Sequence, residues 1–277
     1  MDFVDFLIFS KNRPMQLESL LDSFFHFVDR SLVNKVSILY KADSEYENSY
    51  ELLKVKFSDA VWYQEENFHS QVLDIISNSG EWICFLVDDI MFYQPVKGDI
   101  FPKIDEICFS LRLGENCIYC HPANSYYNQP TFNTDSEFIN WSWFGCQFDF
   151  GYPMSLDGHI FHGKILKDML KYLKFRNPNS LENALVYQNT LLSSLQKTRM
   201  RSFKTSRLVG IPINRVNDEV LNRSGIEFPF SESELLHKFE RGESIDWTSM
   251  DFTKIIGPHQ ELILNFKTSD NYAIRPS

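Results

Sequence analysis

The stretch Trp82-Ile83-Cys84-Phe85-Leu86-Val87-Asp88-Asp89 (WICFLVDD, residues 82–89) joins six consecutive apolar residues to a pair of acids. An apolar run of this length is typical of a buried strand in a parallel sheet. Two carboxylates directly behind such a strand are costly to bury unless a cation or hydrogen-bond donors meet them. Oxygen ligands at a strand end suit Mg²⁺ or Mn²⁺ that bridges phosphates, whereas an acidic surface turn is the simpler alternative.

Three more apolar runs precede this stretch, at Phe3–Phe9, Val36–Tyr40 and Ala60–Tyr63, and segments of helix length separate them. Apolar residues recur at three- and four-residue steps from Leu17 to Val28, and a similar stripe favours a helix over Asn67–Ser77. Strands that alternate with helices predict an α/β fold, with a mixed, mainly parallel sheet flanked by helices.

The second half of the chain is less regular. We expect strands over Ile107–Leu113, Cys117–Cys120, Arg207–Val216 and Pro258–Phe266, and helices over Gly163–Lys174, Ser180–Lys197 and Glu232–Arg241. The polar stretch Asn124–Glu137 predicts a long surface loop. Capping-box spacing marks two helix starts, at Ser44 with Glu47 and at Ser231 with Glu234. Without a repeat or an obvious linker, we expect one domain with a C-terminal extension.

Polar residues follow the other predicted strands, where an open α/β sheet binds its ligands. Ser10 and Arg13 come after the first strand and directly before Pro14. Backbone N–H groups at a helix start, with an arginine beside them, form an anion site, although simple capping is the alternative. Asp43 follows the second strand, where it either accepts hydrogen bonds from a ribose or base or occupies a turn.

Composition narrows the classes of function. The chain has 37 acidic and 27 basic residues, and its net charge of −10 argues against binding nucleic acid through phosphates. The amino terminus lacks the basic start and cleavage site of a signal peptide, and no apolar run approaches the ~20 residues of a transmembrane segment. Five cysteines are too few for a disulfide scaffold. We therefore expect a cytoplasmic protein.

In order and spacing, these pieces resemble the GT-A glycosyltransferases, family 2-like. The pieces are FLIFSKNRP (6–14), Asp43, FLVDDIMF (85–92), SLDGHIFHGKIL (155–166) and FRNPNSLENAL (175–185), and the resemblance spans roughly residues 3–220. It implies the GT-A fold and transfer of a sugar from a nucleotide-diphosphate-sugar donor to a saccharide or other hydroxyl acceptor, as in polysaccharide biosynthesis. It also implies a catalytic domain over residues 1–222, with a donor half (1–110) and an acceptor half (111–222), and an extension over 223–277 packed on it.

The resemblance implies a diphosphate held by Mn²⁺ or Mg²⁺ at Asp88 and Asp89, with the nucleoside against Ser10, Arg13 and Asp43. The family's acid motif is usually Asp-x-Asp. The pair here lacks one outer carboxylate, which leaves open which aspartate binds the metal and which meets the ribose.

Many members of the family add a late histidine to the metal. At that place this sequence offers Asn214 and Asn217, and we take Asn217 as the expected ligand, with fewer protein ligands as the alternative. Arg112 lies within an apolar strand pattern, where an arginine needs an anionic partner. A donor phosphate, Asp89 and a structural salt bridge remain open as that partner.

Two residues compete as catalytic base. Glu182 stands where the family's catalytic acid pair begins, although Asn183 follows it, and its spacing from Asn179 also fits a capping box. Asp157 before Gly158 is the rival, with a turn as its alternative. An inverting transfer needs one carboxylate within reach of the acceptor hydroxyl, and we favour Glu182 slightly. A retaining enzyme could use neither residue in that role.

Aromatic and histidine side chains suggest an acceptor side. His159 is a candidate to line it, and Trp143 is a candidate to stack on a sugar, with core packing as its alternative. Three other motifs are weaker. Gly158–Lys164 lacks the final hydroxyl of a P-loop, Cys117–His121 fits a buried strand better than haem attachment, and His159 with His162 lacks a third zinc ligand.

Two other functions compete with sugar transfer. A sugar nucleotidyltransferase has a related sheet, but it usually carries a glycine-rich loop after the first strand, and SKNRP contains no glycine. A non-catalytic carbohydrate-binding module explains the aromatic residues but not an acid pair behind a buried strand.

Overall fold

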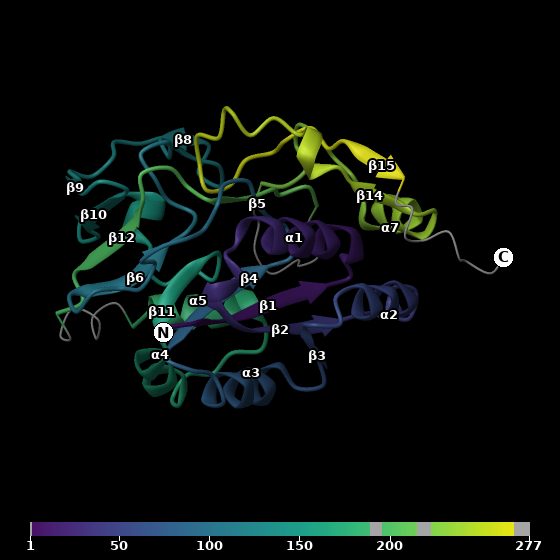
Figure 1. The fold of residues 1–277 in the computed structure, drawn as a ribbon, viewed down its shortest axis with the longest axis horizontal. Coiled ribbons are helices and arrows are strands. Elements are labelled where there is room, and N and C mark those ends of the chain that lie inside the picture. The colour runs from purple at the N-terminus through teal and green to yellow at the C-terminus, as the bar shows by residue number, and fades with distance from the viewer. Residues whose placement is uncertain (1, 189–195, 215–222, 269–277) are drawn as a thin grey trace.

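The computed structural model describes residues 2–188, 196–214 and 223–268 and places a nine-stranded sheet at its centre (Figure 1). In spatial order the strands are β3 (Val61–Gln64), β2 (Val33–Lys41), β1 (Val4–Lys11), β4 (Trp82–Val87), β11 (His159–His162), β6 (Glu106–Ser110), β12 (Arg199–Phe203), β10 (Phe138–Ser142) and β9 (Asn133–Thr134). Neighbours among β3, β2, β1 and β4 are parallel, as are β6 and β12. β11 runs antiparallel to both of its neighbours, so the sheet is mixed.

The register of β1 and β4 brings the first loop to the acid pair. Phe9 pairs with Val87, and the next amide, that of Asp88, donates to the carbonyl of Phe9 over 3.1 Å. Both strands are buried along nearly their whole length, which explains their continuous apolar character. The polar residues that end them therefore share one edge of the sheet.

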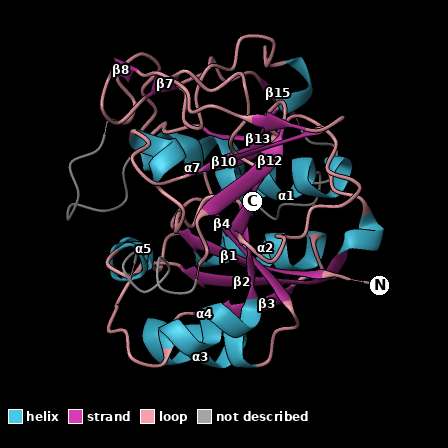
Figure 2. Ribbon diagram, turned by 90° about the vertical axis from the view of Figure 1, so that its left-hand side faces the viewer, coloured by secondary structure: helices cyan, strands magenta, loops and turns pink. Residues whose placement is uncertain are grey.

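Helices cover both faces of the sheet, as the two views show (Figures 1 and 2). On one face, α1 (Pro14–Phe27), α2 (Glu47–Lys56) and α7 (Glu232–Glu240) enclose one hydrophobic core. On the other, α3 (Phe68–Ser77), α4 (Gly163–Leu170) and α5 (Pro178–Val186) enclose a second. This layering confirms the predicted α/β class.

Shorter elements complete the fold. They are β5 (Ile90–Phe92) with β13 (Leu208–Gly210), β7 (Tyr119–Cys120) with β8 (Ser125–Tyr126), β14 (Glu243–Ile245) with β15 (Phe266–Thr268), and the 3-10 turns η1 (Arg30–Leu32), η2 (Phe148–Gly151) and η3 (Trp247–Ser249). The C-terminal residues Leu235, Phe239 and Ile245 are buried in the same core as α1. Among the described residues, no helix combines the length and apolar character needed to cross a membrane.

Two local predictions are wrong. Ser44 does not cap a helix, because α2 begins at Glu47 behind Tyr46, which makes no side-chain cap. Pro258–Phe266 is not a strand, apart from its last residue in β15. It runs beside β13 instead, where Gly210 accepts from the amide of Gln260 over 2.9 Å. The capping box of Ser231 and Glu234 is confirmed.

Candidate active site

The Arg13 side chain joins the first loop to the acid pair. Its Nη1 donates to Asp88 Oδ1 over 3.0 Å and to Asp89 Oδ2 over 3.2 Å, and its Nη2 donates to the carbonyl of Asn214 over 2.5 Å. The second oxygen of Asp88 accepts from the amide of Lys11 over 3.0 Å. The cation that burial of the acid pair demands is thus supplied, at least in part, by the chain itself.

Burial and mutual charge set the ionisation of this group. Burial opposes the charge of Arg13, but Asp88 and Asp89 raise its pKa. Burial raises the pKa of Asp89 to about 6, although Arg13 acts against it. A further cation beside Asp89 would lower that pKa again, so this carboxylate can accept another positive charge.

The other residues predicted near the nucleoside lie on the same edge. Ser10 Oγ is 2.6 Å from the hydroxyl of Tyr50, which also accepts from the amide of Arg13 over 3.2 Å. Asp43 forms two hydrogen bonds with Asn12: its amide donates to Asn12 Oδ1 over 2.9 Å, and its Oδ2 accepts from Asn12 Nδ2 over 2.7 Å. Asn12 has a φ of +54°, a conformation that asparagine tolerates better than most residues.

A second charged cluster surrounds Arg112. Arg112 Nη2 donates to Asp149 Oδ1 over 2.6 Å, and Nη1 donates to Asp157 Oδ2 over 3.3 Å. His259 Nε2 lies 3.1 Å from the same Asp157 oxygen, and its Nδ1 lies 3.4 Å from Arg112 Nη2. Of the partners that the sequence left open for Arg112, the salt bridge is observed. Its carboxylates are Asp149 and Asp157 rather than Asp89.

Glu182 faces this second cluster. Its Oε1 accepts from the amide of Leu156 over 3.0 Å. The capping box of α5 is formed by Asn177 and Ser180, so Glu182 does not cap its helix. Its side chain is instead directed across to the turn that carries Asp157.

The two candidate bases have opposite electrostatic environments. Burial raises the pKa of Glu182 to about 7, and the charge of Asp157 adds to the effect. Burial also opposes the charge of Asp157, but the hydrogen bond from His259 and the charge of Arg112 outweigh it and lower the pKa to about 2. Two carboxyl groups whose pKa values are driven apart in this way are typical of acid–base sites.

The two clusters adjoin each other. The charges of Asp157 and His259 both act on the pKa of Asp89. The carbonyl of Asp89 accepts from the amide of Ile211 over 2.8 Å, directly after the β13 residue Gly210, whose amide bonds to Pro258. The segment 258–260 therefore brings His259 to the acid pair, a placement that its apolar-looking sequence did not reveal.

The two residues expected on the acceptor side are buried. His159 is 1% exposed, with Nδ1 3.0 Å from the carbonyl of Pro153, and burial lowers its pKa to about 3. Trp143 is 5% exposed, and its Nε1 donates to the carbonyl of Lys197 over 2.9 Å. Neither ring has an exposed face that an acceptor could contact, because both are packed in the protein interior. The expected metal ligand Asn217 lies outside the described residues.

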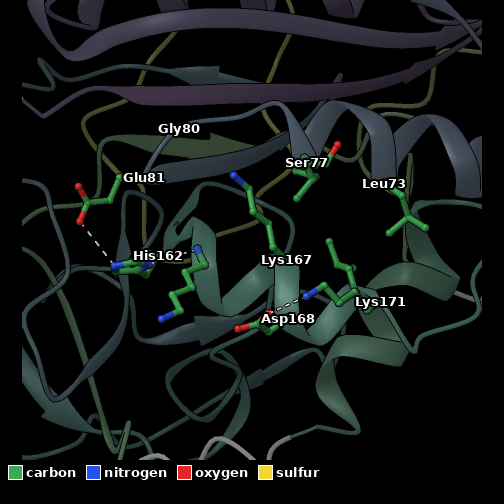
Figure 3. A pocket seen from close by; sticks show the side chains of 11 residues that line it. Leu73, Ser77, Gly80, Glu81, His162, Lys167, Asp168 and Lys171 are labelled. Atoms are coloured by element: carbon green, nitrogen blue, oxygen red, sulfur yellow. Dashed lines mark hydrogen bonds and ion pairs between the residues drawn. The ribbon is translucent and has the colours of Figure 1, made fainter.

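Few of the described side chains near the acid pair could bind a metal ion. Within residues 2–188, 196–214 and 223–268, no three His, Cys, Asp or Glu side chains form a group that could hold one. The acid pair also lies away from two hollows in the described part of the chain. One of these, shown in Figure 3, is lined by Gly80 and Glu81, at the opposite end of β4.

The chain is similar in sequence to a known protein and in fold to solved structures. No protein-family model matches the chain. The bifunctional glycosyltransferase pgtA of Dictyostelium discoideum is 27% identical over an alignment of 252 positions, and the match covers 76% of this chain and 32% of that protein.

Among solved structures, S. aureus TarS superimposes with a TM-score of 0.50 at 12% identity, over 74% of this chain and 36% of that one. A structure of GalNAc-T7 with UDP, GalNAc and Mn²⁺ matches less well, with a TM-score of 0.45 at 11% identity over 75% of this chain and 43% of that one. The chain thus spans about a third of the length of the first two relatives. It has the GT-A fold and is similar in sequence to a protein named a glycosyltransferase.

Proposed function

We propose that this chain transfers a sugar from a nucleotide-diphosphate-sugar donor to a hydroxyl acceptor, of which a saccharide is the expected class. The observation that carries the proposal is the junction of two clusters. One is a buried arginine with an acid pair at the ends of β1 and β4, and the other contains two carboxyl groups of opposed pKa. The similarity to pgtA, which is itself named a glycosyltransferase, supports the same proposal.

For the donor, the hydrogen bonds favour different roles for the two aspartates. Both oxygens of Asp88 are engaged, by Arg13 and by the amide of Lys11, so Asp88 would hold the loop. The second lone pair of each oxygen leaves it able to accept from a ribose hydroxyl as well. Asp89 bonds Arg13 through one oxygen, and its side chain is 21% exposed against 5% for Asp88. Asp89 is therefore the carboxylate that we assign to the diphosphate and its metal. Ser10, Asn12 and Asp43 would contact the nucleoside.

A divalent cation fits this arrangement only as one shared with the donor. Mg²⁺ that bridges phosphates usually takes one or two protein carboxylates and fills its other positions with phosphate oxygens and water. Among the described residues, Asp89 and His259 are the ones that would hold it, and Asn217 stays a predicted further ligand. When bound, such a cation offsets the charge of the leaving diphosphate. Arg13 would support the same charge from the protein side.

For the acceptor, Glu182 suits the role of base better than Asp157. A base works best when its pKa is near the operating pH, and the pKa of Glu182 is about 7. Asp157 is held by Arg112 and His259 and has a pKa of about 2, which makes it a weak base and a fixed negative charge. We assign Asp157 and Arg112 to positioning.

The proposed roles are distributed along the chain in order. Most donor residues come from residues 1–110, the two candidate bases come from 111–222, and His259 comes from the extension. The five cysteines are all free, which is compatible with the cytoplasmic location that we propose. A role in polysaccharide assembly is the biological setting that this chemistry suggests.

A thermal-shift screen with UDP-, GDP-, CMP- and dTDP-sugars, with and without Mn²⁺, tests the proposal. A ligand of the folded state raises Tm, and we expect one donor to do so more strongly with the metal. Asp89→Asn should abolish this shift and donor hydrolysis, whereas Asp59→Asn, at a side chain that is 79% exposed, should change neither. If no donor raises Tm, the proposal fails. Pyrophosphate release from a nucleoside triphosphate would indicate a nucleotidyltransferase instead.

A further inference from the structure

The segment that contains α4 has a charge opposite to that of the whole chain. Residues 163–176 include five basic residues and one acid, although the net charge of the protein is −10. They are Lys164, Lys167, Lys171, Lys174, Arg176 and the acid Asp168. We call this segment, together with Ile104, the α4 surface. A basic segment with regularly spaced apolar residues is typical of proteins that lie on a membrane.

Two hollows flank α4. One of about 660 Å³ lies between α3 and α4 and has Leu73, Ile76 and Leu170 among its apolar walls (Figure 3). The other, of about 650 Å³, lies on the opposite side of α4 and is lined by Ile104 and Tyr172, among others. Lys164 lines both hollows, so basic and apolar groups share the same surface.

Two large apolar side chains of this surface project into solvent. Ile104 is 92% exposed and Tyr172 is 86% exposed, more than any other large hydrophobic residue in the described part of the chain. Such exposure leaves most of the apolar area in water, at a cost that burial would remove. Because both residues line one hollow, a single binding event could cover them.

Lys164 and Lys171 of the α4 surface are available to a new anion. Lys171 pairs with Asp168 over 3.1 Å, but both side chains are about 60% exposed, and such pairs contribute little. For the ammonium of Lys164 we find no ion pair with any described residue. Lys167 is more occupied, because it donates to the carbonyl of Ser79 over 2.5 Å.

We propose that the α4 surface binds the anionic phospholipid face of a membrane. Lipid phosphates would meet Lys164 and Lys171, while Ile104 and Tyr172 enter the interfacial layer. A nucleic acid would satisfy the lysines but not the projecting isoleucine. A protein partner would fill the apolar hollows without needing so many basic residues. The acidic remainder of the chain would be repelled by the same lipids, which fixes the orientation.

This orientation leaves the candidate active site open. Gly80 and Glu81 of the first hollow immediately precede β4, and the acid pair follows it. Six residues of strand, or roughly 20 Å, separate the two ends. The donor site would face away from the lipid, so membrane binding and donor binding are independent and can be tested apart.

Co-sedimentation of the full chain with vesicles tests the proposal. We expect binding to phosphatidylcholine vesicles that contain about one-third phosphatidylglycerol, weaker binding as salt rises, and none to phosphatidylcholine alone. Lys164→Glu with Lys171→Glu, and separately Ile104→Ser with Tyr172→Ser, should each lower the partition coefficient roughly tenfold or more. Lys254→Glu with Lys267→Glu, two exposed lysines of the C-terminal part, makes the same charge change and should have a much smaller effect.

Four results would overturn the proposal of membrane binding. Absence of binding to the anionic vesicles overturns the proposal, and so does binding that both double variants retain. Equal binding to single-stranded DNA would show a general polyanion site and overturn it as well. So would a wild-type dimer in solution that dissociates on the Ile104 and Tyr172 changes. Circular dichroism should show all variants folded, and the single lysine variants replace the pair if it unfolds.

Discussion

The carboxylate of Asp157 lies 3.1 Å from the ring of His259, a residue 102 positions later in the chain. Arg112 contacts both side chains, so Asp157 is held between two groups that favour its charge. Burial opposes ionisation of Asp157, yet the hydrogen bond from His259 and the charge of Arg112 lower its pKa to about 2. The C-terminal segment that carries His259 thereby helps to fix a charge of the candidate active site.

His259→Ala should weaken this pair in a pH-dependent way. The lowered pKa of Asp157 contributes stability above about pH 4, which is lost as pH falls through its folded pKa. The pKa of His259 is raised by Asp157 against the effect of burial, so its contribution is present below about 6.5 and is lost at higher pH. We expect the loss in the free energy of unfolding, about 1–2 kcal/mol, to be largest between about pH 4.5 and 6.5. Urea unfolding across pH measures it.

His237→Ala is the matched control. That ring is 68% exposed on α7 and lies 3.5 Å from Glu240, so its loss should cost less than about 0.5 kcal/mol at any pH. A His259→Ala penalty that does not vary with pH would show that the ring acts only through packing.

Glu182→Gln should both stabilise the fold at high pH and abolish transfer. Because the pKa of Glu182 is raised to about 7, its contribution is favourable below about 4.5 and is lost as pH rises through 7. Glutamine cannot ionise and can still accept from Leu156, so the variant should be more stable by about 1–3 kcal/mol at pH 8 and equal below pH 4. Wild-type kcat/KM should rise with pH through about 7, and the variant should lose about 100-fold or more.

Glu51→Gln on α2 is the matched control. The Glu51 side chain is 64% exposed, so this change should alter neither the stability at pH 8 nor the rate of transfer. Full sugar-transfer activity in Glu182→Gln would show that another group acts as the base. Equal stability of variant and wild type at pH 8 would contradict the raised pKa itself.

Much of the fold could be predicted because local sequence determines it. β4 covers the predicted run Trp82–Val87, and α3 follows its cap Asn67 within the predicted range Asn67–Ser77. The strands β10 and β12 were missed. Arg199–Phe203 carries two arginines: Arg201 lies over the ring of Phe138, and Arg199 pairs with Asp105. The polarity of the segment therefore hides a central strand.

The candidate site could be located from the sequence only where the chain brings its residues to a strand end. Ser10, Arg13, Asp43 and the acid pair lie together because parallel strands end at one edge of the sheet. Nothing in the sequence marks His259, because it lies in a loop. Two backbone hydrogen bonds hold this loop beside β13 and so place His259 at the site. The candidates His159 and Trp143 are both buried, His159 within β11 and Trp143 directly after β10, because a polar or aromatic residue in or beside a strand can also serve as core.

Arg13→Met should destabilise the protein strongly. Methionine keeps most of the volume but leaves Asp88, only 4% exposed, without its cation. Breaking a buried ion pair from one side costs about 3–5 kcal/mol, measured by urea unfolding at pH 7. The double variant Arg13→Met with Asp88→Asn removes the unpaired charge and should recover a part of that loss.

Arg30→Met provides the comparison. Arg30 and Asp59 are 3.9 Å apart, and both side chains are more than 60% exposed, so this change should cost less than about 1 kcal/mol. A similar cost for Arg13→Met would mean that water or another group replaces the guanidinium.

Gly158, next to Asp157, should tolerate alanine far less well than Gly98. Both have positive φ, +81° and +86°, so each change carries a strain of about 1 kcal/mol. At Gly98 a Cβ meets nothing within 4 Å, whereas at Gly158 it lies 2.6 Å from Cδ2 of the buried Leu208. The backbone of Gly158 cannot retreat, because its amide and carbonyl bond to β4 and to Leu111. Gly158→Ala should therefore lose about 1–3 kcal/mol more than Gly98→Ala in urea unfolding. Leu208→Ala in the same chain should cancel much of that excess, and strictly additive losses would exclude the steric cause.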